Sequence, residues 1–496
     1  MDGAVADLIR QLSAQGATIE RLAADSRRCA PGVAFFAYPG ETVDGRVYIP
    51  DAVRRGASAV VWESEGFSWN DGWRVPNASL HGLRREAGRL AHEFYGRPSE
   101  ALWVCGVTGT NGKTSCTQWI AALLGARGVR TGVIGTLGSG FPGALDPSVN
   151  TTPGAVELQA TLAAMRDAGA SAVAMEVSSH ALAQDRVNGV AFDCALFTNL
   201  SHDHLDYHGT MASYAEAKAR LFDSAGLRAA VLNLDDPVGL ELARRLSSRG
   251  LRSIGYSLHD TGTAPSGVSE YVAAKQIICE GQLTKLWLTS SWGELRASVT
   301  QLGRFNVSNA LGVLGCLVAR GIPGAEAAAM LATLPSVQGR MQALGGVDRP
   351  LVVVDYAHTP DALDKVLQAL RPVAEARGGA LVAVFGAGGD RDPSKRAPMG
   401  EVVSRIADRI VITSDNPRGE DPLSIITEIC RGVSRPHVVE PDRARAIGRA
   451  VREAGPRDVL LLAGKGHEPY QEIAGRRLPF SDAGQATAAL DAWSAR

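Results

Sequence analysis

A glycine-rich run that ends in Gly-Lys-Thr constrains this chain more than any other feature. Residues 105–114 read Cys-Gly-Val-Thr-Gly-Thr-Asn-Gly-Lys-Thr, between a short apolar run at 102–104 and an alanine- and leucine-rich helical pattern at 116–126. A glycine-rich turn between a strand and a helix start presents backbone N–H groups and the positive end of the helix dipole to a phosphate chain. We therefore predict a nucleotide-binding loop, with Lys113 near the β- and γ-phosphates and the Thr114 hydroxyl on Mg²⁺.

The match to the usual phosphate-loop pattern, G-x-x-x-x-G-K-[ST], is imperfect, because Val107 stands where that pattern has its first glycine. An ordinary glycine-rich turn is the alternative interpretation. The order of strand, loop, Gly-Lys-Thr and helix favours nucleotide binding.

The length and charge of the chain exclude several classes of protein. With 496 residues the chain is too long for one hydrophobic core, and two to four domains are expected. Its 51 basic and 52 acidic residues give a formal net charge of −1, so no overall field favours nucleic acid or a membrane surface. No apolar run approaches the roughly 18 residues of a spanning helix, and residues 1–12 lack the pattern of a secretory signal. We expect a cytoplasmic protein without membrane insertion.

The seven cysteines are scattered along the chain and form no C-x-x-C motif. Most of them lie within apolar runs, a pattern typical of buried, reduced thiols. We therefore predict neither a disulfide framework nor a zinc site.

Breaks in the sequence pattern predict three domains, 1–98, 99–337 and 338–496. In the first, strand-like runs at 33–37 and 57–62 flank a helix, and a second helix is expected at 80–94 before Tyr-Gly-Arg-Pro at 95–98 ends the pattern. The second alternates strands and helices, as in a mostly parallel sheet, then shows an antiparallel addition at 260–300 and a helix at 305–320. Its expected strands are 102–107, 131–134, 172–175, 195–198 and 229–232.

The third unit reads as another α/β domain. Its expected strands are 351–354, 381–385, 409–412 and 459–462, and its expected helices are 361–374, 397–406, 422–432 and 442–453. Polar loops follow all four strands, at 355–358, 386–396, 415–418 and 464–468. Loops at one edge of a sheet make a binding face, on which Arg391 or Arg418 could recognise a carboxylate by two parallel hydrogen bonds.

Two further segments of the second unit carry polar side chains after strands. Glu176 follows the strand at 172–175, where it could bind a metal ion or form a salt bridge with equal ease. Three histidines and two aspartates lie within residues 202–208; His204 could reach the same ion, although a loop that hydrogen-bonds to itself is the alternative. Mg²⁺ prefers oxygen ligands, and zinc is disfavoured without a matching cysteine or helical histidine pair. Lys218 lies in an amphipathic helical pattern, and by spacing alone a solvated helix face explains it.

Together these segments resemble the Mur ligases, ATP-dependent amide-forming enzymes of peptidoglycan precursor synthesis. The loop 106–114 matches the family's G-x-x-G-T-N-G-K-T, and further family positions follow in order over essentially the whole chain: Glu176, 198–208, Lys218, Asn309, Gly339-Arg340 and Asp355. The resemblance implies an N-terminal α/β domain that binds UDP, a central P-loop ATPase domain with a mostly parallel sheet, and a C-terminal Rossmann-like α/β domain that binds an amino acid.

Within that family, four motifs look like those of the members that add meso-2,6-diaminopimelate to the D-Glu γ-carboxylate of UDP-N-acetylmuramoyl-L-Ala-D-Glu through an acyl phosphate. They are Asp-Ser-Arg at 25–27, Asn-Thr-Thr-Pro at 150–153, Glu-Val-Ser-Ser-His at 176–180 and Asp-Asn-Pro-Arg at 415–418. The resemblance implies that Arg418 pairs with the distal carboxylate, which L-lysine lacks. A lysine-adding ligase and folylpolyglutamate synthase remain alternatives of the same fold. A P-loop nucleotide switch without ligase activity is the alternative from another class.

The resemblance also implies site residues. ATP would contact Gly109, Thr110, Asn111, Gly112, Lys113, Thr114, Asn309, Arg340 and Asp355. The UDP-linked substrate would contact Ser26, Arg27, Asn150, Thr151, Thr152, Ser178, Gln184 and Arg186. Diaminopimelate would contact Arg391, Asp415, Asn416, Arg418, Gly464 and Glu468. Mg²⁺ would be held by Thr114, Glu176, His204 and a carbamate derived from CO₂ on Lys218. The catalytic set would be Lys113, Glu176, His204 and Lys218.

The implied chemistry sets two further expectations. The incoming amine must be neutral to attack, so a base such as His358 or His467 is a hypothesis that spacing cannot test. Water would destroy an acyl phosphate, so we expect the third domain to close over the site before the chemistry. We expect a monomer whose partners are its small-molecule substrates.

Overall fold

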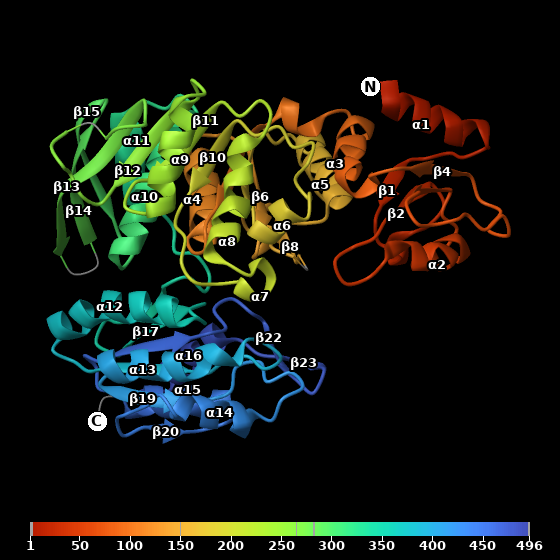
Figure 1. Ribbon diagram of the computed structural model, residues 1–496. Coiled ribbons are helices and arrows are strands. Elements are labelled where there is room, and N and C mark those ends of the chain that lie inside the picture. The colour runs from red at the N-terminus through yellow and green to blue at the C-terminus, as the bar shows by residue number, and fades with distance from the viewer. Residues whose placement is uncertain (1–2, 149, 264, 281–282, 495–496) are drawn as a thin grey trace.

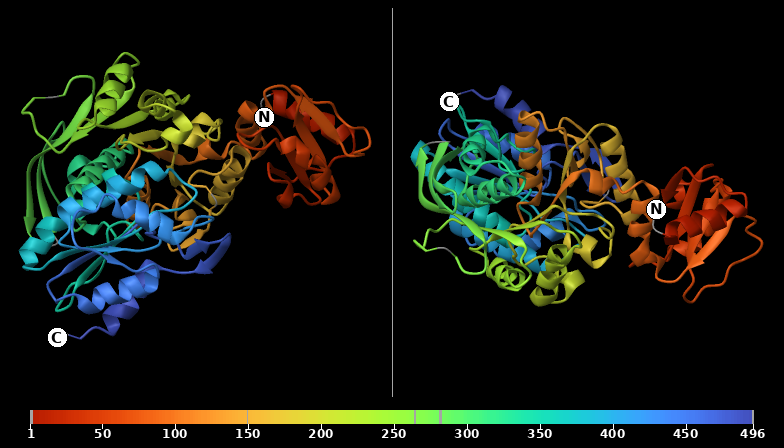
Figure 2. Two further views of the ribbon diagram at one scale, coloured as in Figure 1. Left: turned by 60° about the horizontal axis from the view of Figure 1, so that its bottom comes forward. Right: turned by 90° about the horizontal axis from the view of Figure 1, so that it is seen from above.

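The computed structural model describes residues 3–148, 150–263, 265–280 and 283–494. The described residues form an α/β structure in which three main sheets and a short two-stranded sheet follow one another along the chain (Figure 1). The N-terminal unit lies to one side of the other two in both views of Figure 2, while the central and C-terminal units face each other. Among the described residues, no helix is both long and apolar enough to cross a membrane.

The N-terminal unit is a four-stranded parallel sheet in the order β1-β2-β3-β4. Its strands are β1 (Arg21–Ala23), β2 (Val33–Ala37), β3 (Ala59–Glu63) and β4 (Asn77–Leu80), and its helices are α1 (Gly3–Ala14), α2 (Ile49–Arg54) and α3 (Leu83–Phe94).

The expectation of one helix over 80–94 is wrong at its start. Residues 77–80 form β4, and Gly82 (φ 74°) is the residue before α3. The carboxylate of Glu63 accepts hydrogen bonds from the N–H groups of Gly82 and Leu83 at 3.2 and 2.7 Å. A carboxylate is stabilising at a helix N-terminus, so a residue from the neighbouring strand sets this boundary.

The central unit is an eleven-stranded sheet in the order β15-β14-β13-β12-β11-β10-β5-β9-β6-β7-β8. The strands from β13 to β6 in that order pair in parallel, whereas β14–β15 and β7–β8 add antiparallel pairs at the two edges. The strands are β5 (Trp103–Thr108), β6 (Thr131–Gly135), β7 (Gly138–Phe141), β8 (Ala144–Asp146), β9 (Ala172–Glu176), β10 (Cys194–Phe197), β11 (Ala229–Asn233), β12 (Arg252–Ser257), β13 (Glu270–Glu280), β14 (Leu283–Ser290) and β15 (Gly293–Val299).

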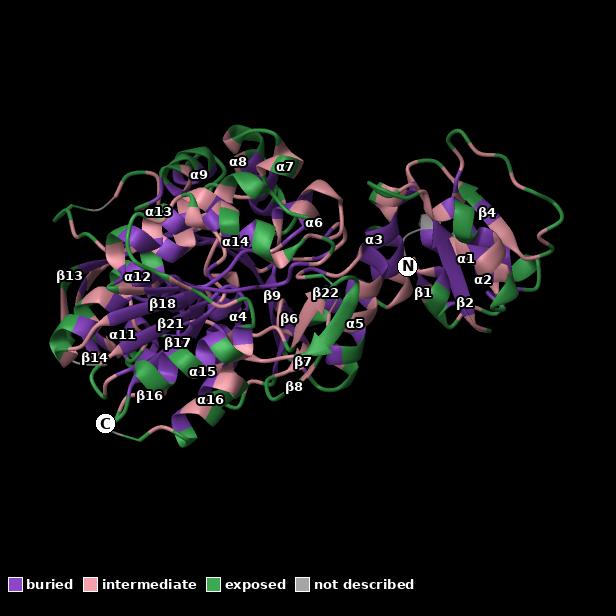
Figure 3. Cartoon of the chain, turned by 90° about the horizontal axis from the view of Figure 1, so that it is seen from below, coloured by how far each residue is buried: buried purple, intermediate pink, exposed green. Residues whose placement is uncertain are grey.

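Helices cover both faces of the central sheet, because alternate residues of its parallel strands point to opposite sides. In β5, Cys105 and Val107 join the apolar cluster beneath α4 and α10, while Val104 joins the cluster on the other face with residues of α5 and α9. Figure 3 shows these central strands as buried. The helices of this unit are α4 (Lys113–Ala126), α5 (Ala155–Asp167), α6 (Ser179–Ala183), α7 (Leu205–His208), α8 (Met211–Ala219), α9 (Pro237–Ser247), α10 (Arg304–Ala319) and α11 (Gly324–Met330).

The C-terminal unit has a six-stranded sheet, β16-β17-β21-β18-β19-β20, in which all pairs but β16–β17 are parallel. A two-stranded hairpin, β22–β23, follows it. The strands are β16 (Gln342–Gly345), β17 (Leu351–Asp355), β18 (Leu381–Phe385), β19 (Arg409–Ile412), β20 (Val438–Val439), β21 (Val459–Ala463), β22 (Tyr470–Ile473) and β23 (Arg476–Pro479). The helices are α12 (Pro360–Arg377), α13 (Arg396–Ile406), α14 (Pro422–Cys430), α15 (Arg443–Glu453) and α16 (Asp482–Asp491). The parallel strands β17, β18, β19 and β21 all point the same way, so the loops after them lie at one edge, as the sequence predicted.

Candidate active site

The predicted phosphate loop joins β5 to α4, and its glycines are required by its shape. Gly112 has φ 87°, and a Cβ there would lie 2.4 Å from Oδ1 of Asn309. Gly109 has φ 147°, and its Cβ would lie 1.9 Å from the hydroxyl of Thr198. Any other residue would be strained and would collide with its surroundings, so the loop backbone is free to approach a ligand closely.

The loop is fastened to the segment after β10. The Thr198 hydroxyl donates to the carbonyl of Asn111 at 2.6 Å, and Oδ1 of Asn199 accepts from the N–H of Asn111 at 3.1 Å. The ammonium of Lys113 lies over the loop and donates to the carbonyls of Gly109 and Thr110, both at 2.8 Å. The lysine is therefore held where a phosphate chain on this loop would meet it.

Lys218 lies beneath the same loop and not on a solvated face, so the interpretation from spacing alone is wrong. Its side chain is 1% exposed, its Nζ donates to the carbonyl of Gly109 at 2.9 Å, and the ring of Tyr214 lies 4.5 Å away. Burial, together with the nearby charge of Lys113, lowers the pKa of Lys218 well below its usual value. The structure thus favours a neutral amine at this position.

Glu176 ends β9 and faces the loop. It is 1% exposed, and its two carboxylate oxygens accept from the backbone N–H and the hydroxyl of Thr136 at 2.8 and 3.1 Å. These neutral donors fix the carboxylate without neutralising its charge. The salt-bridge alternative is therefore not what the structure shows.

The histidines after β10 gather with tyrosines in one aromatic cluster. His204 has φ 54° and precedes α7, and its ring lies 4.9 Å from that of His180 in an edge-to-face arrangement. Tyr207 lies 4.3 Å from His180, and His208 stacks on Tyr214 at 5.0 Å. Burial lowers the pKa of His180 to about 4. His204 also lies 3.5 Å from the carboxylate of Asp203, so the cluster combines ring packing with one acidic neighbour.

A cavity of about 640 Å³ opens over the phosphate loop, between the central and C-terminal units. Arg340 crosses it: its guanidinium donates to the Thr114 hydroxyl at 3.2 Å and lies 4.5 Å from the ring of Tyr356. Asp355 is held by the N–H groups of Met341 and Ala357, both at 2.8 Å, and burial raises its pKa. A volume of this size is typical of a small-molecule site.

Most of the predicted ATP and metal residues line this one cavity. Those that do are Thr110, Asn111, Gly112, Lys113, Thr114, Glu176, His204, Asn309, Arg340 and Asp355, together with Thr151 from the predicted UDP-substrate set. Gly109 and Lys218 lie behind the loop, joined by the hydrogen bond described above.

Four other residues predicted for the UDP-linked substrate form one hydrogen-bonded group: Thr152, Ser178, Gln184 and Arg186. Thr152 donates through its hydroxyl to the carbonyl of Glu176 and accepts from the N–H of Ser178. Arg186 donates to the carbonyl of Thr152 and to Oε1 of Gln184. Asn150 lies exposed before this segment.

Ser26 and Arg27 lie in the N-terminal unit, apart from the cavity. Ser26 donates to Asp51 at 2.9 Å, and Arg27 pairs with Asp25 at 2.7 Å while remaining 80% exposed. The hydrogen bond from Arg27 lowers the pKa of Asp25. An exposed guanidinium of this kind is free to meet an anionic ligand.

The residues predicted for diaminopimelate form a second centre, in the loops after β19 and β21. Asn416 donates to Glu468 at 2.7 Å, and Asp415 lies directly against Gly464, whose φ of 116° and lack of a side chain allow the contact. Arg418, with φ 51°, donates to the carbonyl of Gly389 at 2.7 Å. Arg391 is exposed and donates to the carbonyl of Asp390 at 3.5 Å, outside this network.

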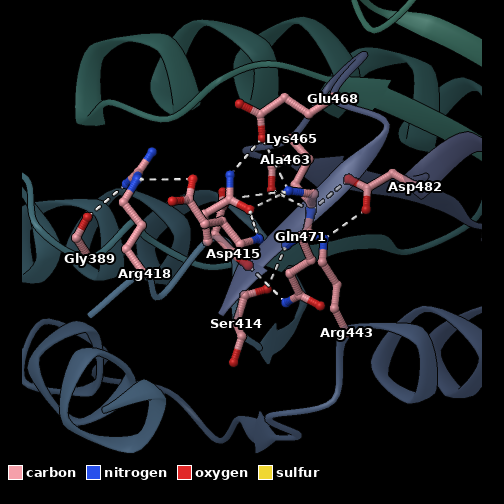
Figure 4. Close-up of polar contacts among 12 residues, drawn as sticks. Gly389, Ser414, Asp415, Arg418, Arg443, Ala463, Lys465, Glu468, Gln471 and Asp482 are labelled. Carbon is pink, nitrogen blue, oxygen red and sulfur yellow. Dashed lines mark hydrogen bonds and ion pairs between the residues drawn. The ribbon is translucent and has the colours of Figure 1, made fainter. Parts of the chain in front are cut away.

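Sequence reasoning missed the residues that hold this centre together. Lys465 is completely buried and bonds to Asn416 and Glu468 (Figure 4). Arg443 and Asp482 form a fully buried ion pair at 2.6 Å, and the same guanidinium donates to the carbonyls of Ser414 and Ala463 (Figure 4). The pair begins α15 and α16, and only the fold brings it to the ends of the strands.

The two candidate bases differ in their surroundings. His358 lines the cavity, and its Nδ1 lies 2.7 Å from the carbonyl of Tyr356, which places the proton on Nδ1 and leaves Nε2 as an acceptor. Burial lowers its pKa, which keeps the ring neutral. Burial and the charge of Arg340 lower the pKa of His467 to about 4, so His467 is the weaker base. Of the two histidines, His358 is therefore better placed to accept a proton from the incoming amine.

Three cysteines that are far apart in sequence meet in the core of the central unit. The sulfur atoms of Cys105, Cys194 and Cys316 lie within 4.8 Å of one another, and all three residues are buried. Their neighbours in this cluster are hydrophobic, and burying thiolates there would be costly. They are free thiols buried in apolar surroundings, as the sequence predicted.

Known protein families match all three units of the chain. The family described as Mur ligase middle domain matches residues 107–317, the Mur ligase, glutamate ligase domain matches 339–466, and the Mur ligase family, catalytic domain matches 18–95. The chain belongs to the Mur ligase family.

Proteins similar to this Mur ligase match it over nearly its full length. The UDP-N-acetylmuramoyl-L-alanyl-D-glutamate--2,6-diaminopimelate ligase of Janthinobacterium sp. (strain Marseille) is 48% identical over 498 residues, which cover 98% of this chain and 97% of that protein. The protein of the same name from Ectopseudomonas mendocina (strain ymp) is 49% identical over 482 residues, covering 97% and 96%. A solved structure of a ligase of that name superposes with a TM-score of 0.68 at 34% identity, covering 96% of this chain and 95% of that one.

Proposed function

We propose that this Mur ligase joins an amine of meso-diaminopimelate to the D-Glu γ-carboxylate of UDP-N-acetylmuramoyl-L-Ala-D-Glu, with conversion of ATP to ADP and phosphate, in cytoplasmic peptidoglycan precursor synthesis. Similarity to ligases of that name over 97–98% of the chain carries the proposal. The cavity over the phosphate loop and the amino-acid loops of the C-terminal unit support it. We also propose that the chain has three domains, 1–98, 99–337 and 338–496. We propose that the protein is a monomer.

The first step brings two anions together, because the γ-carboxylate attacks the γ-phosphorus of ATP to give an acyl phosphate and ADP. Lys113 and Arg340, which both line the cavity, would reduce the repulsion. The oxygens of Thr114 and Glu176, the imidazole of His204 and a carbamate on Lys218 fit a site for Mg²⁺, which would supply further charge neutralisation when bound.

The surroundings of Lys218 support the carbamate. Addition of CO₂ to an amine requires the neutral form, and burial beside Lys113 lowers the pKa of Lys218 toward that form. The modification would turn a buried amine into an oxygen ligand directed at the loop. Asp203 lies close enough to influence both lysines.

In the second step the neutral amine of diaminopimelate attacks the acyl carbon, and the tetrahedral intermediate expels phosphate. We assign His358 as the base, because its Nε2 is an acceptor within the cavity. Asn416, Arg418 and Glu468 would hold the far end of the amino acid. Arg391 would join them by moving its exposed side chain. Arg340 and Tyr356 would help to exclude water from the acyl phosphate.

The alternatives are disfavoured by particular residues. A lysine-adding ligase has no use for an arginine at 418 that pairs with a distal carboxylate. Folylpolyglutamate synthase does not explain the N-terminal sheet with Ser26 and Arg27. A nucleotide switch needs neither the histidine cluster after β10 nor the buried polar network around Lys465.

The test is phosphate release in the presence of ATP, Mg²⁺ and UDP-N-acetylmuramoyl-L-Ala-D-Glu, with meso-diaminopimelate compared with L-lysine. Release with diaminopimelate alone is expected. Release with lysine would retain the ligase and contradict the specificity assigned to Arg418. Silence with both amino acids would contradict the proposed function.

A further inference from the structure

Lys465 is a lysine without solvent access in the loop after β21. Its side chain is 0% exposed, and its ammonium lies 2.9 Å from Oδ1 of Asn416, 3.1 Å from Oε2 of Glu468 and 3.8 Å from Oδ1 of Asp415 (Figure 4). A buried charge is tolerated only when it is paired and hydrogen-bonded. These three side chains provide that pairing, and two of them belong to the Asp-Asn-Pro-Arg motif.

The contacts of Lys465 fix which way the Asn416 amide points. Its Oδ1 accepts from Lys465 and from the backbone N–H of Glu472, both at 2.9 Å, while its Nδ2 donates to Glu468. The reversed amide would set Nδ2 against two donors and Oδ1 against a carboxylate. Only one orientation is therefore compatible with these neighbours. It leaves one N–H of Asn416 without a partner among the described residues.

The remaining groups of the network match the head group of an amino acid. Within the described chain, Glu468 uses Oε2 for both of its hydrogen bonds, which leaves Oε1 to accept from an ammonium. The free N–H of Asn416 and the guanidinium of Arg418 are donors suited to a carboxylate. The ammonium of Lys465 lies 3.1 Å from Glu468 and 3.8 Å from Asp415, and Glu472 lies 3.9 Å from the guanidinium of Arg418. Oε1 of Glu468 and the guanidinium of Arg418 remain as an acceptor and a donor for the ligand. The head group of an amino acid is a zwitterion, whose ammonium needs an acceptor and whose carboxylate needs a donor.

The backbone around this network is held independently of Lys465. The buried Arg443–Asp482 pair fixes the carbonyls of Ser414 and Ala463, one on each loop. Removal of the lysine charge should therefore change the polarity of the pocket more than the position of the loops.

We propose that Lys465 is a positioning residue that sets the polarity of the amino-acid pocket. It orients the Asn416 amide so that its N–H faces the distal carboxylate of diaminopimelate, and it holds Glu468 for the distal ammonium. This inference rests on the proposed function, and it adds to it a residue that determines specificity without touching the substrate.

The test is the Lys465→Met variant, which keeps the length of the side chain and removes its charge and donors. Loss of charge-assisted hydrogen bonds should raise the KM for diaminopimelate roughly 10- to 100-fold. The KM values for ATP and for the UDP-linked substrate should stay within about twofold. The preference for diaminopimelate over L-lysine, measured as the ratio of kcat/KM values, should fall. A merely structural role would lower kcat with every substrate and leave that ratio unchanged, which would overturn the proposal.

The matched control is Lys275→Met, a surface lysine on β13 that is 60% exposed and paired with Glu294; its kinetics should equal those of the wild type. The variant Lys465→Met/Asp415→Asn removes the buried cation with its counter-ion, and should fold while retaining the loss of preference. Failure of both Lys465 variants to fold would assign the lysine a structural role and overturn the inference. A wild type inactive with diaminopimelate would overturn the proposed function, whereas an active wild type with an unaltered variant would overturn this inference alone.

Discussion

At the scale of single residues, Lys218 owes its proposed role to burial. Lys218→Met should lower kcat by roughly 100-fold or more, the scale of losing one electrostatic group at a transition state, because the carbamate and its metal-binding oxygens would be lost. The measurement is steady-state phosphate release, combined with ¹³C NMR of protein equilibrated with ¹³CO₂. The wild type should give a carbamate signal that the variant lacks. The absence of that signal from active wild-type protein would contradict the carbamate.

His467 predicts how stability depends on pH. Its folded pKa is about 4, below the ordinary 6.5, because burial and Arg340 disfavour the protonated form. Between these values the unfolded chain binds more protons, so the contribution of His467 to stability is present above about pH 6.5 and is lost as the pH falls toward 4. The slope is at most about 1.4 kcal/mol per pH unit.

The measurement is the free energy of unfolding by urea at several pH values between 4 and 7. His467→Gln should flatten the dependence, because glutamine does not titrate. The control is His437→Gln, which alters an exposed histidine and should leave the slope unchanged. An equal slope in the wild type and in His467→Gln would contradict the assignment.

Three lysines show which parts of the candidate site could be predicted from the sequence and which could not. Lys113 could be placed from its motif, because the Gly-Lys-Thr order fixes its relation to the loop. The pattern around Lys218 indicated a solvated face. The family resemblance pointed instead to a site residue, and the fold shows its side chain buried beneath Gly109. Lys465 was passed over within a recognised loop, because neither spacing nor composition reports the partners that bury a charge.

At the scale of elements, the shape of the phosphate loop indicates that one methyl group added at Gly112 will weaken nucleotide binding. Gly112→Ala should raise the KM for ATP at least about tenfold, because the added Cβ would lie 2.4 Å from Asn309 at a backbone φ of 87°. The measurement is ATP-dependent phosphate release with the other substrates saturating. Gly125→Ala is the control in α4, the helix that follows the loop, since its Cβ meets nothing within 4 Å, and alanine should stabilise α4 by about 0.5–1 kcal/mol. Equal KM values in the two variants would contradict the prediction.

The beginnings of α15 and α16 are joined to the strand ends by Arg443 and Asp482, both fully buried. Asp482→Ala should reduce the stability of the C-terminal unit by about 3–5 kcal/mol, because it leaves an uncompensated buried guanidinium. The double variant Arg443→Met/Asp482→Leu should lose less stability than Asp482→Ala. Urea unfolding of the two variants measures the difference, and a single variant as stable as the wild type would contradict the argument.

Among elements, the parallel strands and the antiparallel addition at 260–300 were predictable, whereas the β7–β8 hairpin and the start of α3 were not. Buried apolar runs such as 172–175 and 381–385 identify strands because both faces of each sheet are covered by helices. The β7–β8 hairpin escaped prediction because its glycine-rich sequence has little apolar alternation. The start of α3 was misplaced because the residue that caps this helix, Glu63, ends β3 and lies far from α3 in the sequence.

At the scale of the whole molecule, the nucleotide cavity is shared between two units, and the groups proposed for the chemistry come from both. The phosphate loop belongs to the central unit, whereas Arg340 lies just before β16, Asp355 ends β17 and His358 follows β17 in the C-terminal unit. The family resemblance predicted this division. The contacts across it could not be predicted, because they depend on how the two sheets face each other and not on either sequence segment.

Closure of the C-terminal unit over bound ATP is the prediction at this scale. Small-angle X-ray scattering should show a smaller radius of gyration with a non-hydrolysable ATP analogue and the UDP-linked substrate than without ligands, because Arg340 and Asp355 then have a ligand to bind across the cavity. Arg340→Ala removes the donor to Thr114, and should raise the KM for ATP roughly 10- to 100-fold, as expected for a charge-assisted hydrogen bond, and weaken the compaction. Lys275→Met should compact like the wild type. If the ligands left the radius of gyration of the wild type unchanged, water would have to be excluded by the cavity walls as they stand, and domain closure would play no part in protecting the acyl phosphate.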